Sequence, residues 1–148
     1  TVRVPHWPES TTQPGGMLPG YLERMGAEIS FPVIDDVRYC EVTGNGHVSG
    51  LGDFDLTAAG EIAPSLAAIL VFADKPTRMI GELPDGLEIT PVSANRLRPS
   101  VMETYADHRM ATFAAMLGLR IKGIQVKNVA TTAKTLPNFV DLWNDMLV

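Results

Sequence analysis

The spacing of apolar residues changes several times along the chain, between the alternation typical of strands and the three-and-four spacing typical of helices. Alternating or short apolar runs predict strands over residues 2–4, 27–31, 38–42, 54–56, 77–80, 87–90, 101–103 and 123–126. Helical spacing predicts helices over residues 17–25, 63–73, 108–119 and 137–147. The dipeptide Asn45-Gly46 is a strong signal for a β-hairpin turn. Strands that alternate with helices predict an α/β or α+β fold, with helices packed against sheet.

Two stretches of the chain resemble each other weakly. Residues 66–70 and 113–117 are both short apolar helical segments, and each precedes a turn and a predicted strand. These two segments therefore suggest a weak internal repeat.

The composition is that of a single globular domain: 148 residues, of which 45% are hydrophobic and 20% charged. A net charge of −5 argues against a general binder of nucleic acid or of acidic membranes, because such proteins need a basic surface. Residues 63–73 fall short of the roughly 18 apolar residues that a membrane span requires.

The lone Cys40 excludes an intrachain disulfide and favours a reducing cytoplasm. No cysteine–histidine cluster has the spacing of a zinc site. The chain opens at Thr1 without a leader, so we expect a cut inside a longer protein.

Three cationic side chains are expected near helix starts, where anions bind. Asp107 is a good N-cap residue, which places His108 and Arg109 in the first turn of a helix, beside unpaired backbone N–H groups. A cation is unfavourable there unless an anion arrives. Lys134 lies in a predicted loop before a helix with Pro137 in its first turn, where an ammonium group could neutralise a phosphate.

Each of these residues also has a purely structural interpretation. Glu61 lies at the predicted start of a helix. Judged by residue type alone, it is an acid that complements the helix dipole. Arg109 could pair with Asp107 or Glu103, and His108 could hydrogen-bond a neighbouring backbone group. Most lysines in loops such as that of Lys134 are simply solvated. Tyr105 and Trp143 are expected to be packing residues.

Three motifs resemble those of one enzyme family. Residues 105–111, Tyr-Ala-Asp-His-Arg-Met-Ala, resemble the Asp-His-Arg-Met-Ala signature of the 3-phosphoshikimate 1-carboxyvinyltransferases, also called 5-enolpyruvylshikimate-3-phosphate (EPSP) synthases. Residues 133–137, Ala-Lys-Thr-Leu-Pro, resemble the terminal element of that family, and residues 7–14 resemble the start of its last repeat but one. The sibling family that uses a UDP-aminosugar carries Asp-Leu-Arg at the signature, so His108 favours the shikimate enzyme.

The resemblance implies a fold and a domain organisation. Repeated βαβαββ units would form an inside-out, barrel-like α/β domain, and residues 1–148 would be part of the C-terminal domain of the enzyme. We expect the N-terminal partner domain to lie outside these 148 residues. Between Gly81 and Glu82 the family would carry about thirty more residues, far more than a usual connection, with a Lys/His-Glu-Ser/Thr-Asp-Arg motif that this sequence lacks.

The resemblance also implies a reaction. The parent enzyme would move the enolpyruvyl group of phosphoenolpyruvate to the 5-hydroxyl of shikimate 3-phosphate and release phosphate, as a cytoplasmic monomer without metal or organic cofactor. Glu61 would be the catalytic base, and His108, Arg109 and Lys134 would bind phosphoenolpyruvate. Without the missing motif and the partner domain, we expect the 148 residues alone to be inactive. The alternatives are a sibling transferase for a UDP-aminosugar and a non-catalytic anion-binding module.

Overall fold

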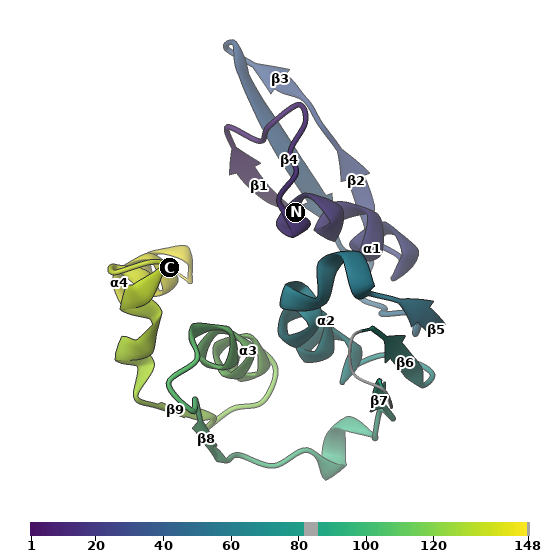
Figure 1. Ribbon diagram of the computed structural model, residues 1–148, viewed down its shortest axis with the longest axis vertical. Helices are drawn as coiled ribbons and strands as arrows, with labels where there is room; N and C mark the ends of the chain where they lie inside the picture. Colours follow the sequence, from purple (N-terminus) through teal and green to yellow (C-terminus); the bar gives the residue numbers. More distant parts are fainter. Residues whose placement is uncertain (82–85, 148) are drawn as a thin grey trace. The chain divides into compact units, whose positions relative to one another are not determined.

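Groups of short strands are separated by helices in the computed structural model, which describes residues 1–81 and 86–147 (Figure 1). The strands are β1 (Val2–Pro5), β2 (Glu28–Ser30), β3 (Val33–Ile34), β4 (Val37–Thr43), β5 (Gly52–Asp55), β6 (Thr77–Ile80), β7 (Leu87–Ile89), β8 (Val101–Glu103) and β9 (Gln125–Lys127). The α-helices are α1 (Leu18–Arg24), α2 (Ala63–Leu70), α3 (His108–Gly118) and α4 (Phe139–Met146). The 3₁₀ helices are η1 (Pro14–Met17), η2 (Thr57–Ile62), η3 (Ala94–Arg96) and η4 (Val129–Lys134). No helix among the described residues is long and apolar enough to cross a membrane.

The chain divides into two compact units. The first comprises residues 1–63 and 70–91, and the second comprises residues 64–69 and 92–148. The first unit therefore contains the strands β1 to β7, and the second contains β8, β9, α3 and α4. Among the described residues the strands form separate small sheets and no closed barrel, so the fold is mixed α/β without the barrel closure that the family resemblance implied.

Strand β4 is the centre of the first sheet and pairs antiparallel with β1, β2 and β3. Strands β3 and β4 are joined by Asp35 and Asp36, which have φ angles of 50° and 60°, while Ile34 pairs with Val37 across the turn. Positive φ at both central residues is the geometry of a type I′ hairpin turn. The predicted strand over residues 38–42 is thus confirmed, whereas β3 was not expected.

The hairpin predicted at Asn45-Gly46 is wrong, because no described strand pairs across it. The side chain of Asn45 instead donates to the carbonyl of Gly26 after α1 (3.1 Å) and accepts the N–H of His47 (2.8 Å). Further along the same segment, Gly50 N–H donates to the Asp74 carboxylate (2.8 Å), and that bond lowers the pKa of Asp74. The segment after β4 is therefore a tightly bonded connection rather than a turn between paired strands.

The strand–helix–strand order occurs twice with parallel pairing. Strand β5 pairs parallel with β6, with η2 and α2 between them in the chain, and β8 pairs parallel with β9, with α3 between them. Parallel neighbours need such a crossover connection. The expected α/β architecture is confirmed.

Leucine, alanine, methionine and aromatic residues build the described core. In the second unit Ala111 and Ala114 are fully buried on α3, which packs against β8, β9 and η4. In the first unit the rings of Tyr21 and Phe54 lie 5.6 Å apart, and the Arg24 guanidinium sits 5.6 Å from the Phe54 ring. Aromatic pairs of this kind contribute about 0.5–1.5 kcal/mol beyond their burial.

Candidate anion-binding site

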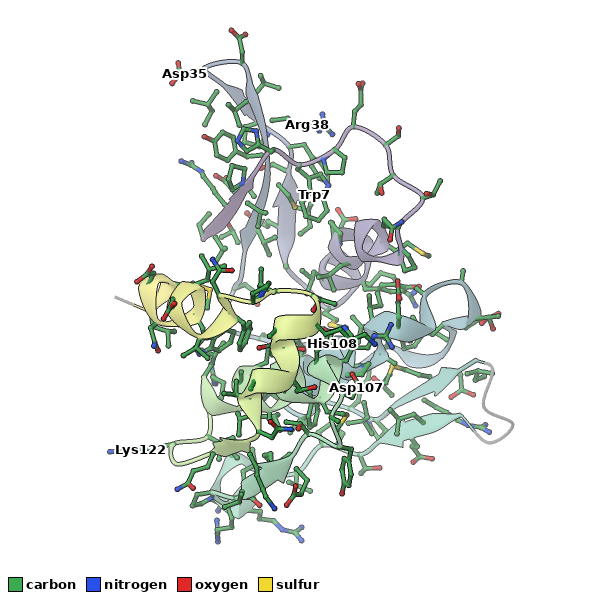
Figure 2. All side chains as sticks on the ribbon, turned by 60° about the vertical axis from the view of Figure 1, so that its left-hand side comes forward. Trp7, Asp35, Arg38, Asp107, His108 and Lys122 are labelled. Atoms are coloured by element: carbon green, nitrogen blue, oxygen red, sulfur yellow. The ribbon has the colours of Figure 1, made fainter. Side chains whose placement is uncertain are left out.

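The first turn of α3 carries His108 and Arg109, as the sequence predicts. Asp107 is extended (φ −108°, ψ 122°), and its side chain accepts the backbone N–H of Arg109 at 2.7 Å, so it is the N-cap. Figure 2 shows Asp107 and His108 side by side at this helix start, where the Nδ1 atom of His108 lies 3.8 Å from Asp107 Oδ1. Such a cap stabilises a helix by about 0.5–2 kcal/mol.

The turn before this cap has an unusual backbone. Tyr105 and Ala106 are both left-handed, with φ angles of 52° and 57°, and Asp107 N–H donates to the carbonyl of Thr104 at 2.8 Å. The expectation that Tyr105 is a packing residue is wrong, because the side chain is 82% exposed. Trp143 does pack, with its ring 5.5 Å from that of Phe139.

Strands β8 and β9 run parallel, so the segments that follow them leave from the same edge of the pair. The segment after β8 leads to His108 and Arg109, and the segment after β9 is η4, which ends at Lys134. Helix α3 and η4 are in contact, so both cation-bearing segments belong to one packed unit. Lys134 is exposed and closes a 3₁₀ helix rather than lying in the predicted loop.

At the end of the same strand pair, Lys127 Nζ donates to Glu103 Oε1 at 2.6 Å. This hydrogen bond and the charge of Glu103 raise the pKa of Lys127. Sequence reasoning missed the pair because its formation depends on the register of β8 against β9. The only signal along the chain was that Glu103 ends one predicted strand and Lys127 directly follows another.

Glu61 lies in the first unit, whereas the three cations belong to the second. It is exposed in η2 and precedes α2, which begins at Ala63, so the expected position in the first turn of the helix is wrong. Asp55 holds the start of this segment, because its carboxylate accepts the N–H of Thr57 at 2.8 Å. Hydrogen bonds from the side chain and backbone of Thr57 lower the pKa of Asp55.

The junction between Gly81 and Glu82, where we expected a further family segment, lies at the edge of the described residues, and Glu82 is outside them. Among the described residues, no group of three or more histidine, cysteine, aspartate or glutamate side chains could hold a metal ion.

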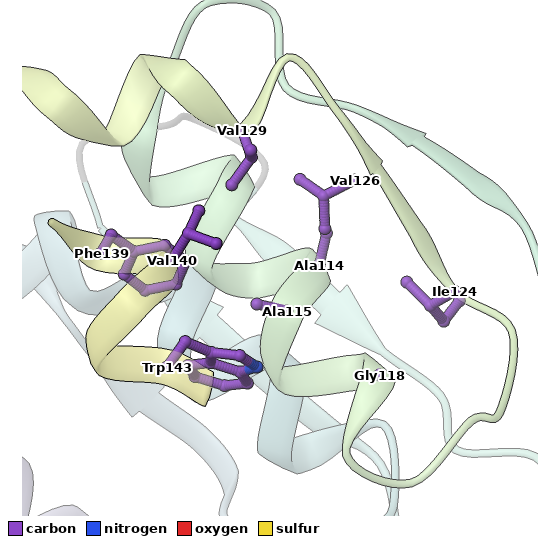
Figure 3. A pocket seen from close by; sticks show the side chains of 9 residues that line it. All are labelled: Ala114, Ala115, Gly118, Ile124, Val126, Val129, Phe139, Val140 and Trp143. Carbon is purple, nitrogen blue, oxygen red and sulfur yellow. The ribbon is translucent and has the colours of Figure 1, made fainter. Parts of the chain in front are cut away.

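A cavity of about 330 Å³ lies within the second unit (Figure 3). Small residues of α3, Ala115 and Gly118, face the aromatic residues Phe139 and Trp143 of α4 across it. Its lining, as far as the structure describes it, contains no charged side chain, so the cavity suits apolar groups rather than an anion.

Comparison with known protein sequences identifies close relatives. The sequence model of the EPSP synthase (3-phosphoshikimate 1-carboxyvinyltransferase) family matches residues 78–143. The 3-phosphoshikimate 1-carboxyvinyltransferase of Bifidobacterium longum (strain DJO10A) is 66% identical over 174 aligned positions that cover 99% of this chain and 39% of the relative. The enzyme of the same name from Kocuria rhizophila is 37% identical, with 99% of this chain and 37% of the relative covered.

Solved structures share the fold at low sequence identity. EPSP synthase from Acinetobacter baumannii superposes with a TM-score of 0.77 at 18% identity, covering 97% of this chain and 41% of that chain. The enolpyruvyl transferase NikO from Streptomyces tendae superposes with a TM-score of 0.67 at 16% identity, covering 88% of this chain and 35% of that chain. The chain is therefore similar along almost its whole length to EPSP synthases, and it spans about two-fifths of the length of the curated relatives it matches.

Proposed function

We propose that the intact protein to which this chain belongs transfers the enolpyruvyl group of phosphoenolpyruvate to the 5-hydroxyl of shikimate 3-phosphate and releases phosphate. The observation that carries this proposal is the Asp107-capped helix start with His108 and Arg109, in a chain 66% identical to a 3-phosphoshikimate 1-carboxyvinyltransferase. The start of α3 presents the positive end of the helix dipole beside two cationic side chains, and phosphoenolpyruvate carries both a carboxylate and a phosphate.

The proposed roles follow from the chemistry of each side chain. Arg109 offers a planar fork to the carboxylate or phosphate, Lys134 offers a compact charge, and His108 donates a further hydrogen bond. Glu61 removes the proton of the 5-hydroxyl, whose oxygen bonds to C2 of phosphoenolpyruvate while C3 is protonated. The adduct then loses a proton from C3 and expels phosphate, which restores the double bond in the product.

We further propose that the 148 residues alone do not turn over. The alignments with the two relatives extend over 174 positions against 148 residues here, so the relatives carry at least 26 residues opposite gaps in this chain. This difference is close to the length of the family segment predicted between Gly81 and Glu82. The acid that protonates C3 would come from that segment, and most contacts to the shikimate phosphate would come from the partner domain.

The test uses the intact protein and this chain in parallel. Phosphate release from phosphoenolpyruvate is measured with shikimate 3-phosphate or with a UDP-aminosugar as the acceptor. We expect turnover by the intact protein with shikimate 3-phosphate only, and none by the 148 residues. Turnover with the UDP-aminosugar would instead identify the sibling transferase, and steady phosphate release by the 148-residue chain would refute its proposed inactivity.

A non-catalytic anion-binding module is the second candidate, favoured by the small share of its relatives that the chain covers. Glu61→Gln in the intact protein separates the two, with Arg109→Gln as the control for binding. The transferase proposal predicts that Glu61→Gln abolishes turnover and keeps phosphoenolpyruvate binding, whereas Arg109→Gln weakens both. A binding module would show no turnover and no effect of Glu61→Gln.

From the single cysteine, Cys40, we infer a cytoplasmic location for the protein. From the family resemblance we infer that the intact protein is a monomer.

A further inference from the structure

We propose that the ion pair between Glu103 and Lys127, here called the terminal ion pair, is a positioning device for the proposed phosphoenolpyruvate site. This inference rests on the proposed function of the cation-bearing segments. In this proposal, the terminal ion pair holds the ends of β8 and β9 together. It thereby fixes the position of the start of α3 relative to the segment η4.

The two residues of the terminal ion pair face each other at the last position of their strands. Glu103 is the register partner of Lys127, and Lys127 Nζ donates to Glu103 Oε1 at 2.6 Å. Side chains directly opposite each other in neighbouring strands are the contacts that most affect pairing. The terminal ion pair therefore closes the strand pair at the edge from which both proposed anion-binding segments leave.

The residues that follow each strand connect the terminal ion pair to the proposed anion-binding residues Arg109 and Lys134. Thr104 follows Glu103, is buried, and accepts the N–H of Asp107 through its carbonyl, which sets the cap of α3. Asn128 follows Lys127 in the left-handed conformation (φ 57°) and accepts the N–H of Thr131 as η4 begins. A shift of either strand end would therefore be carried into the turn that holds Arg109 or into η4.

The strand pair is short and partly exposed. Strands β8 and β9 are three residues long, and parallel pairing is slightly weaker per residue than antiparallel pairing. The inner residues Met102 and Val126 are half-buried, whereas the side chains of Lys127 and Glu103 are 63% and 49% exposed. An exposed pair changes local equilibria only modestly, so the expected effects are several-fold rather than complete.

A direct role of Lys127 as an anion ligand is the competing explanation, and charge substitutions separate the two. Glu103→Lys adds a cation near the proposed site, so simple attraction would tighten the binding of phosphoenolpyruvate. A positioning role predicts the opposite, because two lysines at the register position repel each other and part the strand ends. The exchanged pair, Glu103→Lys with Lys127→Glu, restores an ion pair of reversed direction and leaves the net charge unchanged.

The experiment titrates phosphoenolpyruvate into the 148-residue chain and follows backbone amide shifts by NMR, together with hydrogen exchange in β8 and β9. We expect Glu103→Lys and Lys127→Glu each to weaken binding about two- to fivefold and to speed exchange at the strand ends. The exchanged pair should return both readouts to within about twofold of the original chain.

Three results would overturn the inference. Tighter binding by Glu103→Lys, with no rescue in the exchanged pair, would make Lys127 a direct ligand. Unchanged binding in both single variants would remove any role for the terminal ion pair. If Arg109→Gln also leaves binding unchanged, or the chain shows no shifts with phosphoenolpyruvate, the proposed anion site itself fails, and the positioning role fails with it.

Discussion

Replacing Gly50 by alanine should destabilise the first unit, because the position leaves no room for a side chain. Gly50 is buried, and a Cβ atom there would overlap the backbone carbonyl of Lys75, 2.9 Å from the carbonyl carbon. The carbonyl is part of the backbone, so relief requires a movement of the main chain. That movement would separate segments that three hydrogen bonds now join, from Gly50 N to Asp74 Oδ1, from Leu51 N to Thr77 Oγ1, and from Asp74 N to Val48 O.

The expected loss can be estimated from these contacts. Forcing one extra methyl group into a packed site costs about 1–3 kcal/mol. Weakening one of the three hydrogen bonds adds about 0.5–1.5 kcal/mol. We therefore expect Gly50→Ala to lower the free energy of unfolding by about 2–4 kcal/mol, which is a large part of the stability of a typical domain.

Urea unfolding followed by circular dichroism measures this loss directly, with Gly44→Ala as the matched control. Gly44 lies in the same connection and has nothing within 4 Å of the place its Cβ would occupy, so this substitution should change stability by no more than about 0.5 kcal/mol. If Gly50→Ala unfolds at the same urea concentration as Gly44→Ala, the close approach of Lys75 to Gly50 is wrong.

Three further substitutions test other parts of the structure. Ala106→Gly should raise the free energy of unfolding by about 0.5–1 kcal/mol, because glycine adopts the left-handed backbone at φ 57° without strain. Thermal unfolding measures this as a higher midpoint temperature, and a lower midpoint would contradict the prediction. Leu66→Ala should cost about 2–5 kcal/mol in urea unfolding, since Leu66 is fully buried. Folding lowers the pKa of Asp74 below its ordinary value of 3.8, so its contribution is present above that pH and is lost as the pH falls through the lowered pKa. The urea midpoint of Asp74→Asn should accordingly lie below that of the original chain at pH 7, and the two midpoints should converge in acid below pH 3.8.

Local signals in the sequence predicted local structure well. Strands β6 and β8 have the predicted bounds, and α3 begins at His108 behind the Asp107 cap. Each of these elements is determined by residues close together in the chain, through alternation, helical spacing or an N-cap side chain. The motifs that indicated the family lie in or beside such elements, which explains why the family could be recognised.

Interactions between distant segments escaped prediction. Asn45 has the sequence of a hairpin turn, but its amide bonds to Gly26 across the fold. Tyr105 is left-handed and exposed although its residue type favours burial. The pairing of Glu103 with Lys127 depends on strand register, and register is set by which faces are buried rather than by neighbours in the chain.

The two parallel strand pairs also have a consequence for the order of folding. Gly52 pairs with Thr77 and Val101 with Gln125, so the two pairs close chain loops of almost the same length and lose almost the same conformational entropy. The hairpin that pairs Ile34 with Val37 closes a far shorter loop, while pairing Val2 with Val42 closes a longer one. Because rates fall as contacts become less local, the hairpin should form first, the two parallel pairs at similar rates after it, and β1 should join its sheet last.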